Sequence, residues 1–205
     1  MKITIVYDNE APPQFKSDWG FACLIQTNET TLLFDTGANS NILLGNMKKL
    51  NLDPKSIQAV MLSHDHWDHT GGLSGLLTVN PKITIYKPTF SNKPQQITPG
   101  FMTTGYLSSW SGIQEQSLLC DTKEGLLVIT GCSHPGLENI LDTAKKFGKI
   151  YAVIGGFHGF KKFDALKGIA IVVPCHCTSH TKEIQKLYPD AYEPGGVGKK
   201  LKLSD

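Results

Sequence analysis

Four apolar stretches of this chain each end in a turn that carries histidine. Residues 57–62 precede His64, and residues 126–130, 150–154 and 171–173 precede His134, His158 and His176. Short runs of this kind, rich in β-branched residues, are typical of buried strands. Loops at strand ends commonly carry the chemistry of a protein. We therefore expect a fold that gathers these strand ends, and their histidines, along a common edge.

The densest of these turns lies between Ser63 and Gly72. Its centre, His64-Asp65-His66-Trp67-Asp68-His69, holds three of the seven histidines and two aspartates within six residues. Imidazole nitrogens and carboxylate oxygens are ligands of zinc, manganese and iron. His64 and His66 lie two residues apart and can reach one ion, whereas Asp68 and His69 point elsewhere, which favours two neighbouring metal positions. The plainer alternative is a polar loop whose histidines only form hydrogen bonds.

Composition narrows the class of protein. The 205 residues suffice for one sizeable domain, residues 1–205, and no linker rich in Pro, Gly or Ser divides them. A net charge of +2 with interspersed signs argues against nucleic acid as a partner. No segment approaches the roughly 20 apolar residues that span a membrane. We expect residues 1–7 to form a strand rather than a signal peptide. The five cysteines lack the spacing typical of disulfide-bonded secreted proteins, so we expect a cytoplasmic protein.

The hydrophobic pattern predicts an α/β fold. We expect strands at residues 2–7, 21–27, 31–34, 57–62, 83–87, 117–120, 125–130, 149–154 and 170–173, with the first three forming an antiparallel meander. Helices are expected at residues 39–50, 73–77, 136–147 and 181–187. Residues 88–112 are rich in Pro, Ser, Thr and Gly, and they predict a mostly irregular excursion that could border the site. A short tail follows the last predicted helix. Two strand-rich halves that each feed helices suggest two sheets faced by helices.

Several of these motifs together resemble a known family. Residues 34–37 (Phe-Asp-Thr-Gly), 63–73, 130–134, 155–158 (Gly-Gly-Phe-His) and 176–178 (His-Cys-Thr) carry the resemblance. The chain is similar to the metallo-β-lactamase superfamily, and within it to the dihydropterin ribofuranosylaminobenzene 5′-phosphate synthase-like branch. The resemblance implies a four-layer αββα sandwich. It also implies one metal held by His64, His66 and His134, and a second held by Asp68, His69 and His176.

Two positions depart from the family pattern. Most of the superfamily has a bridging aspartate after the strand that follows the His134 motif, but here that strand ends in Gly155-Gly156. His158 stands close to this position, and we interpret it as a substrate or catalytic contact, with metal ligation as the alternative. The nearest carboxylate, Asp164, is interpreted as a surface residue. Ser179 stands where the branch has glycine, which leaves the local backbone conformation open.

Other polar residues near the motifs have two readings each. The resemblance makes Asp35 a residue that orients the histidine loop by hydrogen bonds, whereas the plain reading is a turn aspartate. Cys132, Cys175, Cys177 and His180 are interpreted as packing or supporting groups. Trp67 either walls the pocket or packs beneath the loop.

These residues predict a metal-dependent hydrolase, or a diphosphate-displacing transferase, that acts on an ester, phosphoester or diphosphate small molecule through metal-activated water. Asp68 would receive a proton from that water, and His158 would act on the substrate. We expect one or two ions of Zn²⁺, with Mn²⁺ or Fe²⁺ as alternatives. β-Lactam hydrolysis, di-iron redox chemistry and nucleic-acid processing are disfavoured. A non-catalytic metal-binding or sensing protein of the same fold is the competing hypothesis.

Overall fold

A computed structural model describes residues 1–88 and 90–204. The backbone divides into two compact units, which are treated separately below. The N-terminal unit consists of Met1–Lys87 with Gly195–Leu203, and the C-terminal unit consists mainly of Pro88–Pro194. The single domain expected from the sequence stays a prediction.

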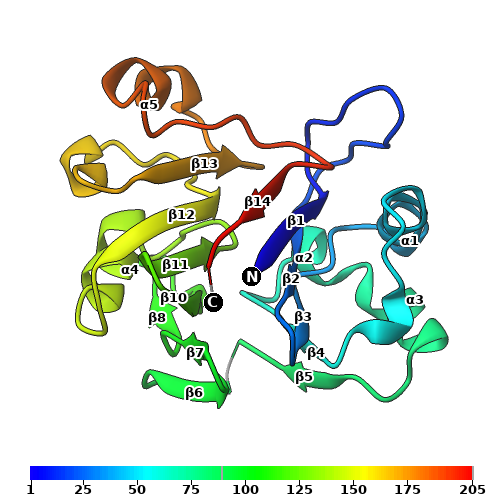
Figure 1. The fold of residues 1–205 in the computed structure, drawn as a ribbon. Coiled ribbons are helices and arrows are strands. Elements are labelled where there is room, and N and C mark those ends of the chain that lie inside the picture. The colour runs from blue at the N-terminus through cyan, green and yellow to red at the C-terminus, as the bar shows by residue number, and fades with distance from the viewer. Residues whose placement is uncertain (89, 205) are drawn as a thin grey trace. The chain divides into compact units, whose positions relative to one another are not determined.

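The N-terminal unit is built on a six-stranded sheet of order β14-β1-β2-β3-β4-β5 (Figure 1). Its strands are β1 (Lys2–Tyr7), β2 (Ala22–Gln26), β3 (Thr31–Phe34), β4 (Ala59–Met61), β5 (Thr84–Tyr86) and β14 (Lys200–Lys202). The predicted antiparallel meander of β1, β2 and β3 is confirmed, and β4 and β5 run parallel to β3. The tail was expected to be irregular, but β14 pairs with β1 from the far end of the chain.

Helices of this unit lie against one face of the sheet (Figure 1). They are α1 (Ser40–Lys49), α2 (Trp67–Thr70), α3 (Leu73–Val79) and the 3₁₀ turn η1 (Pro54–Ser56). Helix α1 begins where the Asn39 side chain accepts hydrogen bonds from the backbone N–H groups of Asn41 and Ile42. Leu43 and Met47 of α1 and Leu76 of α3 pack with sheet residues in one apolar cluster. This packing is what the helical spacing of the apolar residues predicts.

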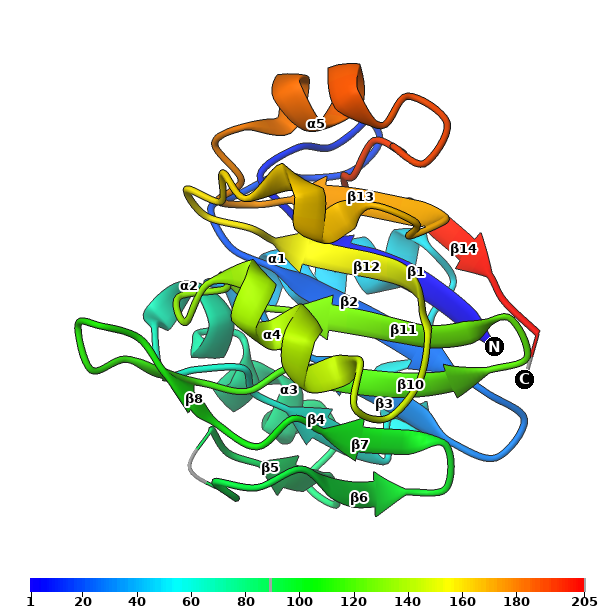
Figure 2. The same ribbon diagram turned by 90° about the vertical axis from the view of Figure 1, so that its left-hand side faces the viewer.

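The C-terminal unit carries a second six-stranded sheet of order β13-β12-β11-β10-β7-β6 (Figure 2). Its strands are β6 (Gln95–Thr98), β7 (Phe101–Thr103), β10 (Leu118–Thr122), β11 (Gly125–Thr130), β12 (Ile150–Gly156) and β13 (Ile171–Cys175), and a separate ribbon pairs β8 (Leu107–Ser108) with β9 (Gln114–Glu115). The predicted β10–β11 hairpin is confirmed. Strands β11, β12 and β13 are parallel neighbours, so their carboxyl ends lie at one edge of this sheet.

Helices α4 (Leu137–Ala144) and α5 (Thr181–Leu187) belong to the same unit, with the 3₁₀ turn η2 (Phe163–Leu166) between them. Figure 2 shows α4 lying across the sheet. Ile140 and Leu141 of α4 and Ile184 of α5 are buried in one cluster with Val128, Val153 and other sheet residues. Both predicted helices are therefore confirmed, α5 with the expected bounds.

The segment of residues 88–112 is mostly irregular, as predicted, but it also contains the short strands β6, β7 and β8, which were not predicted. Thr89 lies outside the described residues. The alternating Phe101 and Thr103 are both buried, and β7 pairs with β10. Three residues of alternation are too short to stand out among the surrounding turn-forming residues, and pairing with a stable neighbour decides the strand. The histidine loop was likewise incompletely predicted, because it contains the short helix α2.

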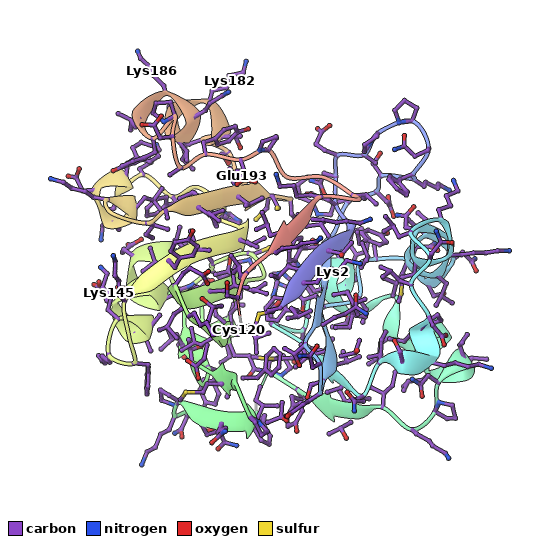
Figure 3. The ribbon with its side chains drawn as sticks, in the orientation of Figure 1. Lys2, Cys120, Lys145, Lys182, Lys186 and Glu193 are labelled. Atoms are coloured by element: carbon purple, nitrogen blue, oxygen red, sulfur yellow. The ribbon has the colours of Figure 1, made fainter. Side chains whose placement is uncertain are left out.

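Several lysine side chains of the C-terminal unit are exposed. The lysine pairs 145–146 and 161–162 are exposed. Figure 3 shows Lys182 and Lys186 extending from α5. Among the described residues no helix has the length and apolar character needed to cross a membrane.

Candidate metal centre

The N-terminal unit places four predicted ligands directly after β4. His64 and His69 are fully buried and Asp68 is nearly so, whereas His66 is exposed. His64 Nε2 lies 3.0 Å from His66 Nδ1, close to the roughly 3.3 Å expected between two nitrogens bound to one tetrahedral zinc ion. His69 Nε2 lies 3.8 Å from Asp68 Oδ2. The His64 and His69 ring centroids are 4.2 Å apart, so the side chains of the histidine loop lie close together within this unit. Their division between two metal positions stays a prediction.

Asp35 orients this histidine loop. Its Oδ1 accepts a hydrogen bond of 2.7 Å from the Ser63 backbone N–H, and its Oδ2 accepts one of 2.7 Å from Ser63 Oγ. Oδ2 also lies 2.7 Å from His69 Nδ1. Donation from Nδ1 to the carboxylate leaves the Nε2 lone pair of His69 available to a metal. The positioning role implied for Asp35 is thus supported by its contacts, and the plain turn reading is not sufficient.

Asp35 occupies an energetically unfavourable position, both in its burial and in its backbone conformation. It is fully buried and has a backbone φ of 57°, in the left-handed region that non-glycine residues rarely occupy. Burial raises the pKa of its carboxyl group, while the His69 imidazole and the Ser63 donors oppose that rise. Backbone strain of this kind concentrates at functional sites.

Gly71 and Gly72 bring the end of the histidine loop against the segment that follows Asp35. A Cβ atom on Gly71 would lie 2.2 Å from the Ala38 carbonyl oxygen, and one on Gly72 would lie 2.1 Å from that of Thr36. Both glycines have ordinary negative φ values, so they serve close packing rather than an unusual turn. Thr36 completes the contact, because its N–H donates to the His69 carbonyl over 2.8 Å.

The C-terminal unit places His134, His158 and His176 after β11, β12 and β13, at the shared edge of the three parallel strands. His158 has φ 45° and His176 has φ 49°. The residue before His134, Ser133, has φ 61°. All three strand ends therefore leave the sheet through a strained residue, as Asp35 does in the other unit. The joining of these histidines with His64, His66, Asp68 and His69 in metal sites stays a prediction of the resemblance.

Glu115, at the end of β9, was missed by the sequence analysis. Its carboxylate is buried and accepts hydrogen bonds from three consecutive backbone N–H groups, those of Cys132 (2.9 Å), Ser133 (2.8 Å) and His134 (2.8 Å). Glu115 Oε2 also lies 2.9 Å from His134 Nδ1. This contact leaves His134 Nε2 as the nitrogen available to a metal, in parallel with Asp35 and His69. No local pattern around Gln114-Glu115 signals this role, because its partners lie 17 to 19 residues away.

We expect the substitution Glu115→Gln to weaken Zn²⁺ binding by roughly 10- to 100-fold, the usual effect of losing an outer partner of a metal-bound histidine. The glutamine side chain has one oxygen where glutamate has two, and its NH₂ group cannot accept a hydrogen bond. Depending on its orientation, either His134 or the backbone N–H groups of Cys132 and Ser133 lose their acceptor. Competition with a chromophoric chelator measures the affinity. Gln114→Ala on the same strand is the matched control and should bind as the wild type does. Wild-type affinity in Glu115→Gln would contradict the role assigned to Glu115.

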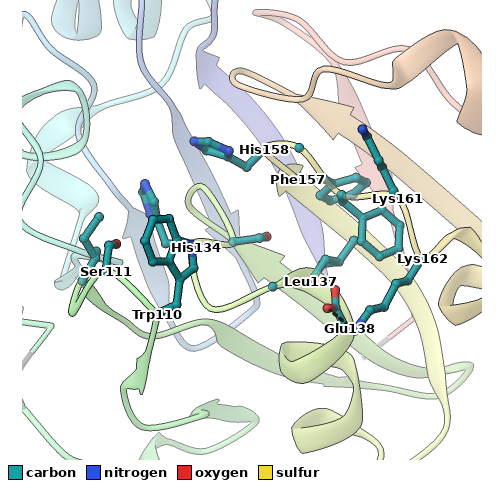
Figure 4. A pocket seen from close by; sticks show the side chains of 14 residues that line it. Trp110, Ser111, His134, Leu137, Glu138, Phe157, His158, Lys161 and Lys162 are labelled. Carbon is teal, nitrogen blue, oxygen red and sulfur yellow. Dashed lines mark ion pairs between the residues drawn. The ribbon is translucent and has the colours of Figure 1, made fainter.

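A pocket of about 590 Å³ opens beside His134 and His158 in the C-terminal unit (Figure 4). Its wall also includes Trp110, Phe157 and Lys161. The His134 and His158 ring centroids are 5.3 Å apart. Partial burial lowers the pKa of His158, and the neighbouring His134 lowers it further, while Glu115 opposes the shift. The volume suits a small molecule.

The remaining predicted residues are placed as follows. Asp164 is exposed, which confirms its interpretation as a surface residue. Trp67 is 61% exposed and does not pack beneath the loop. Ser179 is not among the residues with positive φ, so its serine needs no glycine-like conformation. His180 pairs with Glu183 at the start of α5, at 3.4 Å.

Comparison with known proteins identifies the fold. Residues 20–97 match the family model described as the metallo-beta-lactamase superfamily. The crystal structure of Tm1679, described as a metal-dependent hydrolase of the beta-lactamase superfamily, aligns over 100% of both chains with 29% identity and a TM-score of 0.77. The chain has the metallo-β-lactamase fold. The α/β fold class and the resemblance stated from the sequence motifs are thereby confirmed.

Curated proteins include relatives that match most of this chain in sequence. A synthase of Methanocaldococcus jannaschii, named 7,8-dihydropterin-6-methyl-4-(beta-D-ribofuranosyl)-aminobenzene-5'-phosphate synthase, is 28% identical over 92% of this chain and 91% of its own length. A second, uncharacterized protein of that organism is 27% identical over 96% and 98%. The chain is thus similar both to a protein described as a hydrolase and to one named as a synthase, so the reaction has to be argued from the site.

Proposed function

We propose that this protein is a metal-dependent hydrolase that acts on a small molecule bearing an ester, phosphoester or diphosphate group. In this proposal His64, His66 and His134 hold one divalent ion, and Asp68, His69 and His176 hold a second. Zn²⁺ is the expected metal because the donors are mainly imidazole nitrogens. We place the activity in the cytoplasm, because all five cysteines are free thiols.

One observation carries the proposal: carboxylates anchor the outer nitrogens of two predicted ligands. Asp35 contacts His69 Nδ1 and Glu115 contacts His134 Nδ1, each over less than 3 Å. Carboxylate–histidine pairs of this kind are typical of metal ligands, because the carboxylate sets the tautomer and aims the other nitrogen. Histidines that only fill a polar loop do not require two buried carboxylates with this geometry. The residues therefore fit a divalent metal.

The chain's own groups have distinct tasks in this proposal. A divalent ion, when bound, supplies Lewis-acid polarisation and activation of water at neutral pH. Asp68 takes up the proton that the water loses. The His158 imidazole contacts the substrate by a hydrogen bond at the wall of the pocket. Lys161 is exposed there and attracts an anionic group, while Lys162 is engaged by Glu138 at 3.0 Å.

A transferase that displaces diphosphate is the second candidate. The name of the synthase from M. jannaschii favours it, since that relative matches nearly the whole chain. The same residues would then stabilise a departing diphosphate while an amine or carbon nucleophile attacks. A non-catalytic metal-binding or sensing protein is the third candidate, and metal stoichiometry separates it from the enzymes. Two tightly held ions per chain favour catalysis, whereas one weakly held ion favours sensing.

The test is turnover on a panel of phosphoesters, diphosphates, lactones and thioesters. We expect the Zn²⁺-loaded protein to hydrolyse at least one class, and the chelator-treated protein to recover that activity only when metal is restored. Diphosphate release that requires an added amine acceptor would instead indicate the transferase. Equal turnover with and without metal, or none on any class with two ions bound, would contradict the hydrolase.

A further inference from the structure

Two thiols and one imidazole converge in the C-terminal unit at the ends of β11 and β13. The side-chain donor atoms of Cys132, His176 and Cys177 all lie within 4.8 Å of one another. Cys132 is buried, and the other two are partly buried. Neither Cys132 nor Cys177 forms a disulfide, and Cys177 Sγ lies 3.8 Å from the Cys132 carbonyl oxygen. The cluster thus joins residues 45 positions apart, which the sequence analysis had interpreted as packing thiols.

Strand β12, which lies between β11 and β13, has glycines where the Cys177 sulfur packs against it. A Cβ atom on Gly156 of β12 would lie 2.8 Å from Cys177 Sγ and 2.4 Å from the Gly131 carbonyl oxygen. A Cβ atom on Gly155, whose φ is 129°, would lie 2.0 Å from the Thr130 carbonyl oxygen. No side chain fits at either position, so β12 contributes no carboxylate here. The Cys177 sulfur occupies the space in which a side chain at position 156 would begin.

The turn that carries His176 and Cys177 is held rigidly. Thr178 Oγ1 donates to the Cys175 carbonyl oxygen over 2.7 Å and accepts from the Phe157 N–H over 2.9 Å. The left-handed conformation of His176, with φ 49°, interrupts the alternation of side chains that a continuing strand would impose. Adjacent residues 176 and 177 can therefore both supply a donor to one point. Cys175 is different, because its thiol donates to the Val173 carbonyl oxygen of its own strand at 3.4 Å.

We propose that Cys132, Cys177 and His176 form a thiolate-containing metal site for Zn²⁺ or another borderline-soft divalent ion. Thiolate sulfur and imidazole nitrogen are the donors that Zn²⁺ prefers in proteins, and this cluster offers two of the first and one of the second. Each thiol releases its proton when the ion binds. The inference deepens the proposed function, since His176 is one of the ligands proposed there, and it assigns sulfur ligands where β12 supplies no carboxylate.

Titration of the full-length, reduced, metal-free protein with Co²⁺ under anaerobic conditions tests this site. Thiolate ligation produces a sulfur-to-cobalt charge-transfer absorption in the near ultraviolet, which nitrogen and oxygen ligands do not produce. We expect this band in the wild type and its removal by Zn²⁺. Because the intensity of the band rises with the number of thiolate ligands, we expect Cys177→Ser and Cys132→Ser each to reduce it strongly or to abolish it. Cys175→Ser, which changes a neighbouring thiol outside the cluster, should retain it.

The possible outcomes are distinguishable from those of the turnover test, because the band requires no substrate. A wild type without the band, or a band that keeps its wild-type intensity in both Cys132→Ser and Cys177→Ser, overturns the site. A band together with no hydrolysis supports the site and contradicts the proposed function. Because Cys132 is buried, the circular dichroism spectrum of Cys132→Ser is compared with that of the wild type to show that the variant folds. If it does not fold, Cys177→Ser decides, because Cys177 is partly exposed.

Discussion

Replacement of His66 by alanine is expected to lower kcat/KM by more than about 100-fold, beyond the loss that an outer partner of a metal ligand causes. The reason is geometric, because His66 Nδ1 faces His64 Nε2 at 3.0 Å and one of the two converging nitrogens would be removed. Its ring is exposed, so we expect the free energy of unfolding to change by only about 0.5 kcal/mol or less. Steady-state kinetics with Zn²⁺ in excess, together with urea denaturation, measures both quantities.

His180→Ala is the matched control for loss of a histidine. His180 is partly exposed and pairs only with Glu183 among the contacts described above. We expect its activity to equal that of the wild type. A wild-type kcat/KM in His66→Ala would show that His66 is not a metal ligand. The 3.0 Å distance between His64 Nε2 and His66 Nδ1 would then not indicate a shared ion.

Replacement of Asp35 by alanine is expected to reduce both stability and metal binding. Three donor groups, two on Ser63 and one on His69, would lose a buried acceptor at once. Breaking a buried charged network of this kind costs about 3–5 kcal/mol of unfolding free energy. We also expect Zn²⁺ affinity to fall by at least roughly 10- to 100-fold, because the His69 tautomer is no longer set. Denaturation of the metal-free protein isolates the first effect, and chelator competition isolates the second.

Asp35→Asn separates the two effects of Asp35. Asparagine tolerates the left-handed backbone and retains one oxygen for the Ser63 N–H, so the loss of unfolding free energy should be smaller, about 1–3 kcal/mol. Its NH₂ group cannot accept from His69 Nδ1, so metal affinity should fall nearly as far as in Asp35→Ala. A stable Asp35→Ala variant with wild-type affinity would show that Asp35 is only a turn residue.

Most of the secondary structure could be predicted because its signals are local. Strands β1, β3 and β11 and helix α5 have the predicted bounds, since alternation and helical spacing act over a few residues. The errors occur where pairing with a distant partner decides the structure. Strand β14 forms because Lys2 meets Lys202 across the sheet, and β7 forms because β10 offers it backbone partners. Neither segment carries enough alternation of its own to predict a strand.

The sequence by itself determined the chemistry of the candidate site. Histidines and aspartates placed after strands identified the donor types, and the motifs identified the fold that carries them. Only the tertiary structure decided which groups support those donors. Glu115 lies in an unremarkable polar stretch, yet it holds the His134 turn through four contacts, and Gly156 leaves space for the Cys177 sulfur. The physical reason is that donor chemistry belongs to a residue type, whereas the aim of an imidazole or thiol depends on buried partners far away in the chain.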